Sequence, residues 1–296
     1  MATLKALKTR IGSVSSSEKI TGAMKMISSA KVHKNEAELR KLLPFKNQVK
    51  SIMGHLLETD MEFDSPLLME REVKKVGVVV YGTDDGLCGA YNLNIFKHLL
   101  IEISRLHQEY GNDLEITIFP VGKKILKAVS RIKNEDIKLK AIQGVDSKML
   151  PSVVNNFVNE LRNSFVTGDL DLIEVVYMQF KSMSKQLLTV EQLFPVSRQV
   201  IEGDNLNAES DNKLYIFEPD ANSIFNEVLP MFVLSTMQEI TIENRASEQA
   251  ARVMAMQSAN DNAKKLLESL QLEFNKLRQQ GITTELLDIL GGQVER

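Results

Sequence analysis

The stretch VGVVVYGTDDGLCGAYNLNIFKHLL, residues 76–100, decides what kind of domain lies in the middle of this chain. It begins with a continuous β-branched run, which is typical of a strand buried on both faces. A glycine-rich loop follows and leads directly into a segment with helical character. Nucleotide-binding proteins often place a strand, a loop and a helix in this order at a phosphate site. The stretch therefore raises the question of whether the chain binds a nucleotide.

The segments after this stretch continue the alternation of strands and helices. Further strands are expected at residues 115–122, 137–142, 171–180 and 185–196, and helices at residues 93–110 and 150–165. The last two strands read as a hairpin. This alternation predicts an α/β domain with a mostly parallel, Rossmann-like sheet, which we place at residues 75–200.

Both ends of the chain are predicted to form long helices. In residues 1–57, Leu4, Leu7 and Ile11 step by three and four positions, as in a coiled-coil seam. We assign residues 213–296 to a C-terminal helical segment, whose pattern runs from about residue 220 to the glycine pair at 291–292, a sensible stop. At about 1.5 Å per residue, such a helix would be on the order of 100 Å long. It must therefore pair with another helix or lie inside a larger assembly.

The two ends are the obvious partners for each other. Small residues such as Ala250, Ala251 and Ala255 would let another backbone come close. The predicted fold class is thus α/β, with an antiparallel coiled coil of long N- and C-terminal helices and an inserted Rossmann-like α/β domain. Residues 1–50 carry eleven basic against three acidic side chains, a net charge of +8. This pattern fits either a solvated helix face or a basic helix that faces acidic protein surfaces.

Composition excludes several classes of protein. The 296 residues contain 36 basic and 39 acidic side chains, so the overall charge indicates neither a nucleic-acid nor a membrane partner. Cys88 is the single cysteine, which excludes an internal disulfide and favours a reducing compartment. There is no signal-peptide pattern and no apolar run of roughly 20 residues that could span a bilayer. We expect a soluble chain, or one attached to a membrane only through its partners.

The glycine-rich loop lacks the residues of a phosphate site. Leu87 and Cys88 follow Gly86 where a P-loop has lysine and serine or threonine. Asp84 and Asp85 would repel phosphate, although the N-terminus of the following helix would attract it. A tight turn or an interface is therefore favoured over a nucleotide site. Cys88 is expected to be a small packing residue rather than a nucleophile, and neither metal-ligand spacings nor nucleic-acid signatures are found.

Four stretches together resemble one family. KITGAMKMISSAK (19–31), DDGLCGAYN (84–92), SEQAARVMAMQSANDNA (247–263) and ITTELLDILGG (282–292) are similar to the gamma subunit of F-type ATP synthase. The resemblance implies a coiled coil inside a hexamer of alpha and beta subunits, with the α/β domain beside the epsilon subunit and on the membrane ring of c subunits. It implies a non-catalytic rotor shaft, present once per complex, that couples proton or sodium flow to ATP synthesis and binds no cofactor. The location would be the cytoplasmic side of a bacterial plasma membrane.

The resemblance also implies contact residues. The positions that would meet a beta subunit are Met24, Lys25, Arg252, Arg278, Gln279, Thr283 and Glu285. Those that would meet the c ring are Tyr215 and Glu218. For each of them, a solvated or coil-packing side chain is the alternative.

The sequence departs from the family at three positions. Gly82 and Asp85 replace the serine and basic residue that are common in the loop, which weakens a charge-based role for it, and Gly281 replaces a helix former. Two other functions stay open at this point. One is a nucleotide-binding α/β enzyme with helical extensions, and the other is a coiled-coil tether of a different complex.

Overall fold

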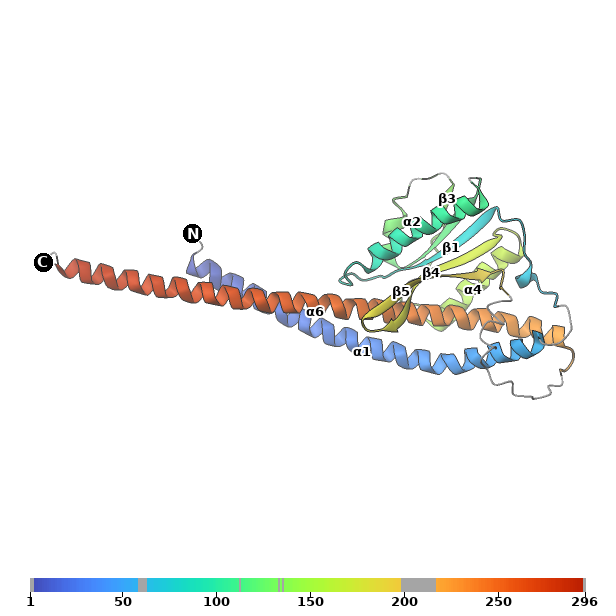
Figure 1. Ribbon diagram of the computed structural model, residues 1–296, viewed down its shortest axis with the longest axis horizontal. Coiled ribbons are helices and arrows are strands. Elements are labelled where there is room, and N and C mark those ends of the chain that lie inside the picture. Colours follow the sequence, from blue (N-terminus) through green and yellow to red (C-terminus); the bar gives the residue numbers. More distant parts are fainter. Residues whose placement is uncertain are drawn as a thin grey trace. The chain divides into compact units, whose positions relative to one another are not determined.

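The computed structural model describes residues 3–57, 63–111, 113–132, 134, 136–197 and 217–294. Two long helices, α1 (Leu4–Leu57) and α6 (Ala221–Val294), precede and follow an α/β domain in the chain (Figure 1). The chain divides into two compact units. The first combines residues 1–30 with 252–296, and the second comprises residues 31–251.

A five-stranded sheet forms the centre of the second unit. Its strands are β1 (Lys75–Tyr81), β2 (Glu115–Val121), β3 (Ile137–Leu139), β4 (Leu172–Ser182) and β5 (Lys185–Phe194). They are ordered β3-β2-β1-β4-β5, with β5 antiparallel to β4 and the other pairs parallel. The mostly parallel sheet and the hairpin are thus confirmed, although the third strand ends at Leu139 rather than at residue 142.

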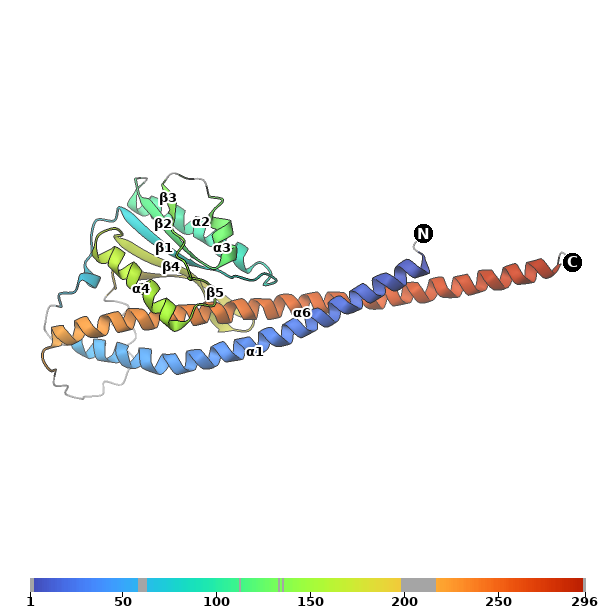
Figure 2. The same cartoon turned by 180° about the vertical axis from the view of Figure 1, so that it is seen from behind.

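Helices cover both faces of this sheet (Figure 2). They are α2 (Tyr91–Tyr110), α3 (Lys123–Val129) and α4 (Pro151–Val166), preceded by a short 3-10 turn η1 (Pro66–Leu68). Val76, Val78 and Val80 of β1 are buried against α2 and α3. Val79 and Tyr81 point to the opposite core, which α4 shares with the two long helices. The β-branched run is therefore buried on both faces, as its composition predicts.

Within the second unit, α1 and α6 run antiparallel. Lys46 of α1 forms an ion pair with Glu239 of α6, and eight residues earlier Glu38 lies 3.6 Å from Arg245. Numbers that rise on one helix as they fall on the other define the antiparallel direction.

In the first unit, α1 and α6 are in direct contact at Asn260. Its Nδ2 donates to the Glu18 carbonyl oxygen at 2.6 Å. A Cβ on Gly22 would lie 3.3 Å from the same nitrogen, so glycine permits this close approach of the helices. The expected pairing of the two chain ends is confirmed here as well.

The glycine pair at residues 291–292 does not stop the C-terminal helix. The prediction was wrong, because α6 continues through both positions to Val294. A glycine in a helix costs about 1 kcal/mol relative to alanine, which weakens a helix without forbidding it. Pro44 and Pro230 likewise lie inside helices that continue past them.

Candidate functional site

The loop between β1 and α2, residues 82–90, is held by hydrogen bonds among its own residues and with Asn92 of α2. The Thr83 amide donates to Asn92 Oδ1 at 3.1 Å, and Asn92 Nδ2 donates back to Thr83 Oγ1 at 2.8 Å. Thr83 Oγ1 in turn donates to the carbonyl oxygen of Asp85 at 2.7 Å. Cys88 is buried and lies 3.5 Å from Asn92 Nδ2, in agreement with a packing role.

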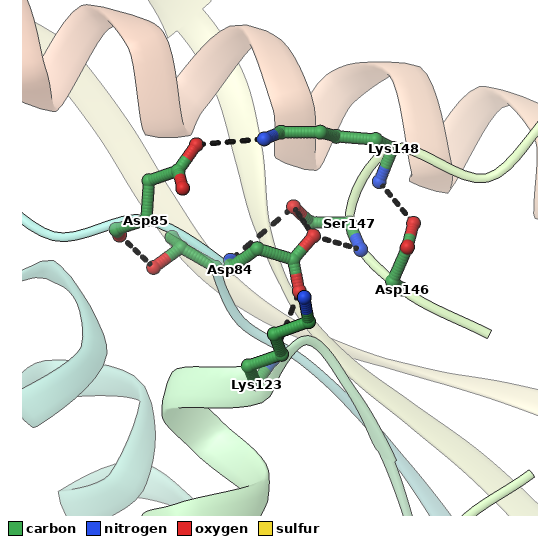
Figure 3. A network of polar contacts seen from close by, with 7 residues as sticks. Asp84, Asp85, Lys123, Asp146, Ser147 and Lys148 are labelled. Atoms are coloured by element: carbon green, nitrogen blue, oxygen red, sulfur yellow. Dashed lines mark hydrogen bonds and ion pairs between the residues drawn. The ribbon is translucent and has the colours of Figure 1, made fainter. Parts of the chain in front are cut away.

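Asp84 connects this loop to two other segments (Figure 3). Its Oδ1 accepts the backbone N–H of Lys123, the first residue of α3, at 3.0 Å. Its Oδ2 accepts both the amide of Ser147 at 3.1 Å and the Ser147 hydroxyl at 2.7 Å. The Asp84 carboxylate thus lies at the start of α3 and accepts one of its free N–H groups, whereas the helix that follows the loop is α2.

Asp85 forms the outer part of the same network. Its carboxylate pairs with Lys148 Nζ at 2.8 Å, and both side chains are largely exposed. The hydrogen bond from Lys148 to Asp85 raises the pKa of Lys148. The two loop aspartates therefore make contacts inside the chain. This geometry supports a turn and not a phosphate site.

Gly82 and Gly89 are required by the shape of the turn. A Cβ on Gly82 would lie 2.6 Å from Ile125 Cβ, a distance that side chains do not tolerate. Gly89 has a φ of 62°, in the left-handed region that favours glycine. Gly82 and Gly89 thus serve close packing and backbone geometry, whereas a Cβ on Gly86 would meet only Lys124 Cε at 3.9 Å.

Four of the predicted contact residues lie close together along α6. Arg278, Gln279, Thr283 and Glu285 are all exposed, and they fall within about two helical turns. Thr283 Oγ1 donates to the carbonyl oxygen of Gln279 at 2.9 Å, so this hydroxyl already has a partner in its own helix. The guanidinium of Arg278 is presented to solvent, as a bidentate contact with a carboxylate requires.

Met24, Lys25 and Arg252 are less accessible. Met24 and Lys25 are half-buried on α1, and Arg252 of α6 is only 5% exposed. Its burial is the feature expected of a coil-packing residue, which was the alternative for each of these positions.

The two predicted c-ring residues belong to the segment before α6. Glu218 is exposed, next to the cis peptide bond that joins it to Pro219. Tyr215 lies outside the described residues.

A basic groove lies beside residues 34–42 of α1, in the second unit. Its volume is about 580 Å³, and its charged lining residues are Lys34, Lys41, Lys148 and Arg245 together with Glu38, which pairs with Arg245 at 3.6 Å. Leu42, Met149 and Ile242 add an apolar part to the lining. Lys34 and Lys41 of α1 thus belong to a surface that is partly basic and partly apolar, and such a surface suits an acidic protein partner.

Two buried carboxyl groups have perturbed titration. Burial, followed by the Glu239 and Glu191 carboxylates, raises the pKa of Glu243 to about 8. Burial also raises the pKa of Glu174 to about 7, although Arg105 at 2.6 Å lowers it. Both groups lie between packed elements.

The described residues offer no obvious chemistry of other kinds. Within these ranges, no cluster of histidine, cysteine, aspartate and glutamate could hold a metal ion. None of the helices in the same ranges combines the length and apolar character needed to cross a membrane.

The sequence did not predict the hydrogen-bond network of Asp84, nor a second, buried hydrogen-bond network around Asn244 of α6. Asn244 and Thr241 are both buried on a helix face that also carries Met237 and Ile240. Polar residues one turn apart on an apolar face were the available signal.

Comparison with known proteins covers the whole chain. A family model described as ATP synthase matches residues 3–294. The ATP synthase gamma chain of Bacteroides thetaiotaomicron is 37% identical, over 100% of both chains. That of Histophilus somni strain 2336 is 33% identical, over 99% of both.

Solved structures share the fold at lower identity. One is a chain of the Euglena gracilis mitochondrial ATP synthase, OSCP/F1/c-ring, at 20% identity with a TM-score of 0.64, covering 98% of this chain and 93% of that one. Another belongs to the Tetrahymena thermophila mitochondrial ATP synthase central stalk and c-ring, also at 20% identity, with a TM-score of 0.55, covering 81% of this chain and 99% of that one.

Paired terminal helices, an inserted α/β domain and these matches define the class of protein, a central-stalk subunit of a rotary ATP synthase. The full-length match to curated gamma chains then fixes the family. The chain belongs to the ATP synthase gamma-chain family, whose members are the central-stalk subunit of F-type ATP synthase.

Proposed function

We propose that this chain turns as the shaft between a membrane ring of c subunits and a hexamer of alpha and beta subunits, without a catalytic site of its own. The observation that carries this proposal is the full-length match to gamma chains, combined with a helix of 74 residues whose C-terminal part is exposed. Leu286, Leu287 and Ile289 are each more than half exposed there. Exposed apolar side chains at such density are typical of a surface that a partner covers.

Seven residues belong to the proposed contact with beta subunits, six by touching the partner and Arg252 by supporting the coil beneath it. They are Met24, Lys25, Arg252, Arg278, Gln279, Thr283 and Glu285. The exposure of the last four supports direct contact, because a planar guanidinium and an amide on a rigid helix can hydrogen-bond a partner loop. Half-buried Met24 and Lys25 fit contact through part of their side chains. Arg252 fits best as a residue that holds the coil in shape beneath the contact.

At the other functional end, Tyr215 and Glu218 would meet the c ring, with an epsilon subunit beside the α/β domain. We propose one copy per complex, peripheral attachment at the cytoplasmic side of a bacterial plasma membrane, and ATP synthesis driven by protons or sodium ions. The bacterial origin of the relatives supports this location. The functional division would be residues 1–57, 75–200 and 213–296.

The first test is affinity purification of the tagged chain from gently solubilised native membranes, with subunit stoichiometry and ATPase activity measured on the eluate. We expect one copy of the chain with three alpha and three beta subunits, and ATP hydrolysis. Recovery of the chain alone, or only with itself, would contradict the proposal.

A second test addresses the contact residues on α6. The double variant Arg278→Ala/Gln279→Ala should lower the rate of ATP synthesis in energised vesicles, because it removes the exposed donors. Lys264→Ala/Lys265→Ala is the matched control, since it alters two exposed side chains on the same helix. Equal synthesis rates in both variants would show that Arg278 and Gln279 do not serve as the contact.

A further inference from the structure

One face of α6 in the second unit is joined to the α/β domain by directional contacts. The side chain of Asn244, only 1% exposed, is the centre of these contacts. The single proton of the Tyr91 hydroxyl is shared between Asn244 Oδ1 at 2.8 Å and the Asn244 carbonyl oxygen at 3.1 Å. Asn244 Nδ2 donates to the carbonyl oxygen of Gly82 at 3.2 Å, and the Met178 amide donates to Oδ1 at 3.4 Å. One side chain thus holds the end of β1, the start of α2 and the strand β4.

A second contact lies one turn earlier on the same helix. The Tyr81 and Thr241 hydroxyl oxygens are 2.8 Å apart, and both side chains are buried. Thr241 Oγ1 donates to the Met237 carbonyl oxygen at 2.8 Å. Since a threonine hydroxyl has a single proton, Tyr81 is the donor in the pair with Thr241. Two polar contacts three residues apart therefore fix one face of α6 against the end of β1.

The sheet leaves groups that asparagine is suited to satisfy. The pairing of β1 with β4 ends at Val80 and Val176, so Met178 lies beyond the last residue pair on the β1 side, while on the other side it pairs with Leu188 of β5. An aliphatic residue at position 244 would remove the acceptor that Asn244 Oδ1 offers to the Met178 amide, and buried amides are costly to leave unpaired. An asparagine side chain offers an acceptor and a donor at one place, and here it uses both.

We infer that Asn244 is the positioning residue that transmits torque from the α/β domain to α6. This inference rests on the proposed rotor function and adds a residue that touches no other subunit in that proposal. Apolar packing opposes separation of two surfaces but has no preferred direction within them. Hydrogen bonds depend on distance and angle, so a small rotation or slide of α6 breaks them. The Asn244 contacts therefore resist the movement that a turning load imposes on the join between domain and helix.

The test compares complete ATP synthase in inverted membrane vesicles with wild-type chain and with Asn244→Ala. Two quantities are measured on the same vesicles: ATP hydrolysis with the gradient collapsed by an uncoupler, and the final pH gradient that ATP builds. We expect Asn244→Ala to retain hydrolysis per assembled complex and to lose much of the final gradient. This result would mean that the contact between the α/β domain and α6 fails when rotation works against a pH gradient, but not when the gradient is collapsed. A defect in folding alone would lower the amount of complex and leave the gradient per hydrolysis rate unchanged.

Two further variants complete the design. Tyr91→Phe removes one hydroxyl and keeps the ring, so it should lower the gradient in the same direction by less. It decides the question if Asn244→Ala complexes do not assemble. Ser235→Ala is the control, because buried Ser235 donates only within α6, to the Phe232 carbonyl oxygen at 2.8 Å.

The outcomes separate the inference from the proposal beneath it. Gradients in Asn244→Ala or Tyr91→Phe vesicles equal to wild type at equal hydrolysis would overturn the role of Asn244 and leave the rotor function standing. If vesicles that lack this chain built the same pH gradient as wild-type vesicles, the proposed rotor function itself would be refuted.

Discussion

Replacing Glu243 by glutamine should remove a pH dependence from the stability of the chain. Glu243 is 7% exposed on α6, and its pKa is raised from an ordinary value of 4.5 to about 8. The carboxyls of Glu239 and Glu191 favour the neutral form, while Lys181 and Lys46 oppose it. The folded protein therefore binds a proton that the unfolded chain has released between about pH 4.5 and pH 8.

The sign of the effect follows from this uptake. A carboxyl with a raised folded-state pKa is least unfavourable below about pH 4.5, and stability is lost as pH rises through about 8. Taken in full, the shift would cost more than about 3 kcal/mol between pH 5 and pH 8. Because the carboxyl retains some contact with solvent, we expect about 2 kcal/mol.

Thermal unfolding at the two pH values measures this difference. Glu243→Gln should melt about 4–8 °C above wild type at pH 8, and close to wild type at pH 5. Glu227→Gln on the same helix is the control, since Glu227 is exposed. If Glu243→Gln changed the melting temperature equally at pH 5 and pH 8, the carboxyl would titrate normally and the reasoning would be refuted.

Four further substitutions test the loop and the long helix. Gly82→Ala would place a Cβ 2.6 Å from Ile125 Cβ and should lower the free energy of unfolding in urea by about 1–3 kcal/mol. Asp84→Ala removes an acceptor used by three donors and should cost about 1–3 kcal/mol in the same assay, whereas Asp85→Ala breaks an exposed ion pair and should cost less than about 1 kcal/mol. Equal costs would contradict this account of the loop. Gly281→Ala has open space around the new Cβ and should stabilise the end of α6 by about 1 kcal/mol, seen as slower amide hydrogen exchange there; unchanged exchange would argue against it.

The architecture was accessible from the sequence because it depends on local patterns. A β-branched run such as residues 76–81 has few ways to be buried other than in a central strand, and β1 occupies those positions. Heptad spacing at Leu4 and Leu7 similarly predicts α1 without knowledge of its partner. The helix end was predicted less well, because glycine stops a helix only where the chain beyond it turns away.

The polar contacts were not accessible in the same way. Asp84 meets Ser147 across 63 positions, and Tyr91 meets Asn244 across 153. Contacts between residues so far apart in the sequence depend on strand order and on how far each strand extends past its neighbour. Neither can be predicted from a local pattern. The sequence predicted that Asp84 and Asp85 would repel phosphate, but it did not predict that they contact Ser147 and Lys148.

In this fold, apolar packing and the Asn244 hydrogen bonds have different roles: the first stabilises the contact between β1 and α6, and the second defines its geometry. Buried apolar residues of β1 and α6 supply most of the driving force for packing. The asparagine instead defines a single register, because its donor and acceptor reach their partners in one arrangement of α6 only. A domain that merely had to stay attached would not require this. A domain that turns a helix does require it, because each rotation applies a sideways force to the contact between the domain and α6. Apolar packing has no preferred direction along that contact, whereas hydrogen bonds depend on distance and angle.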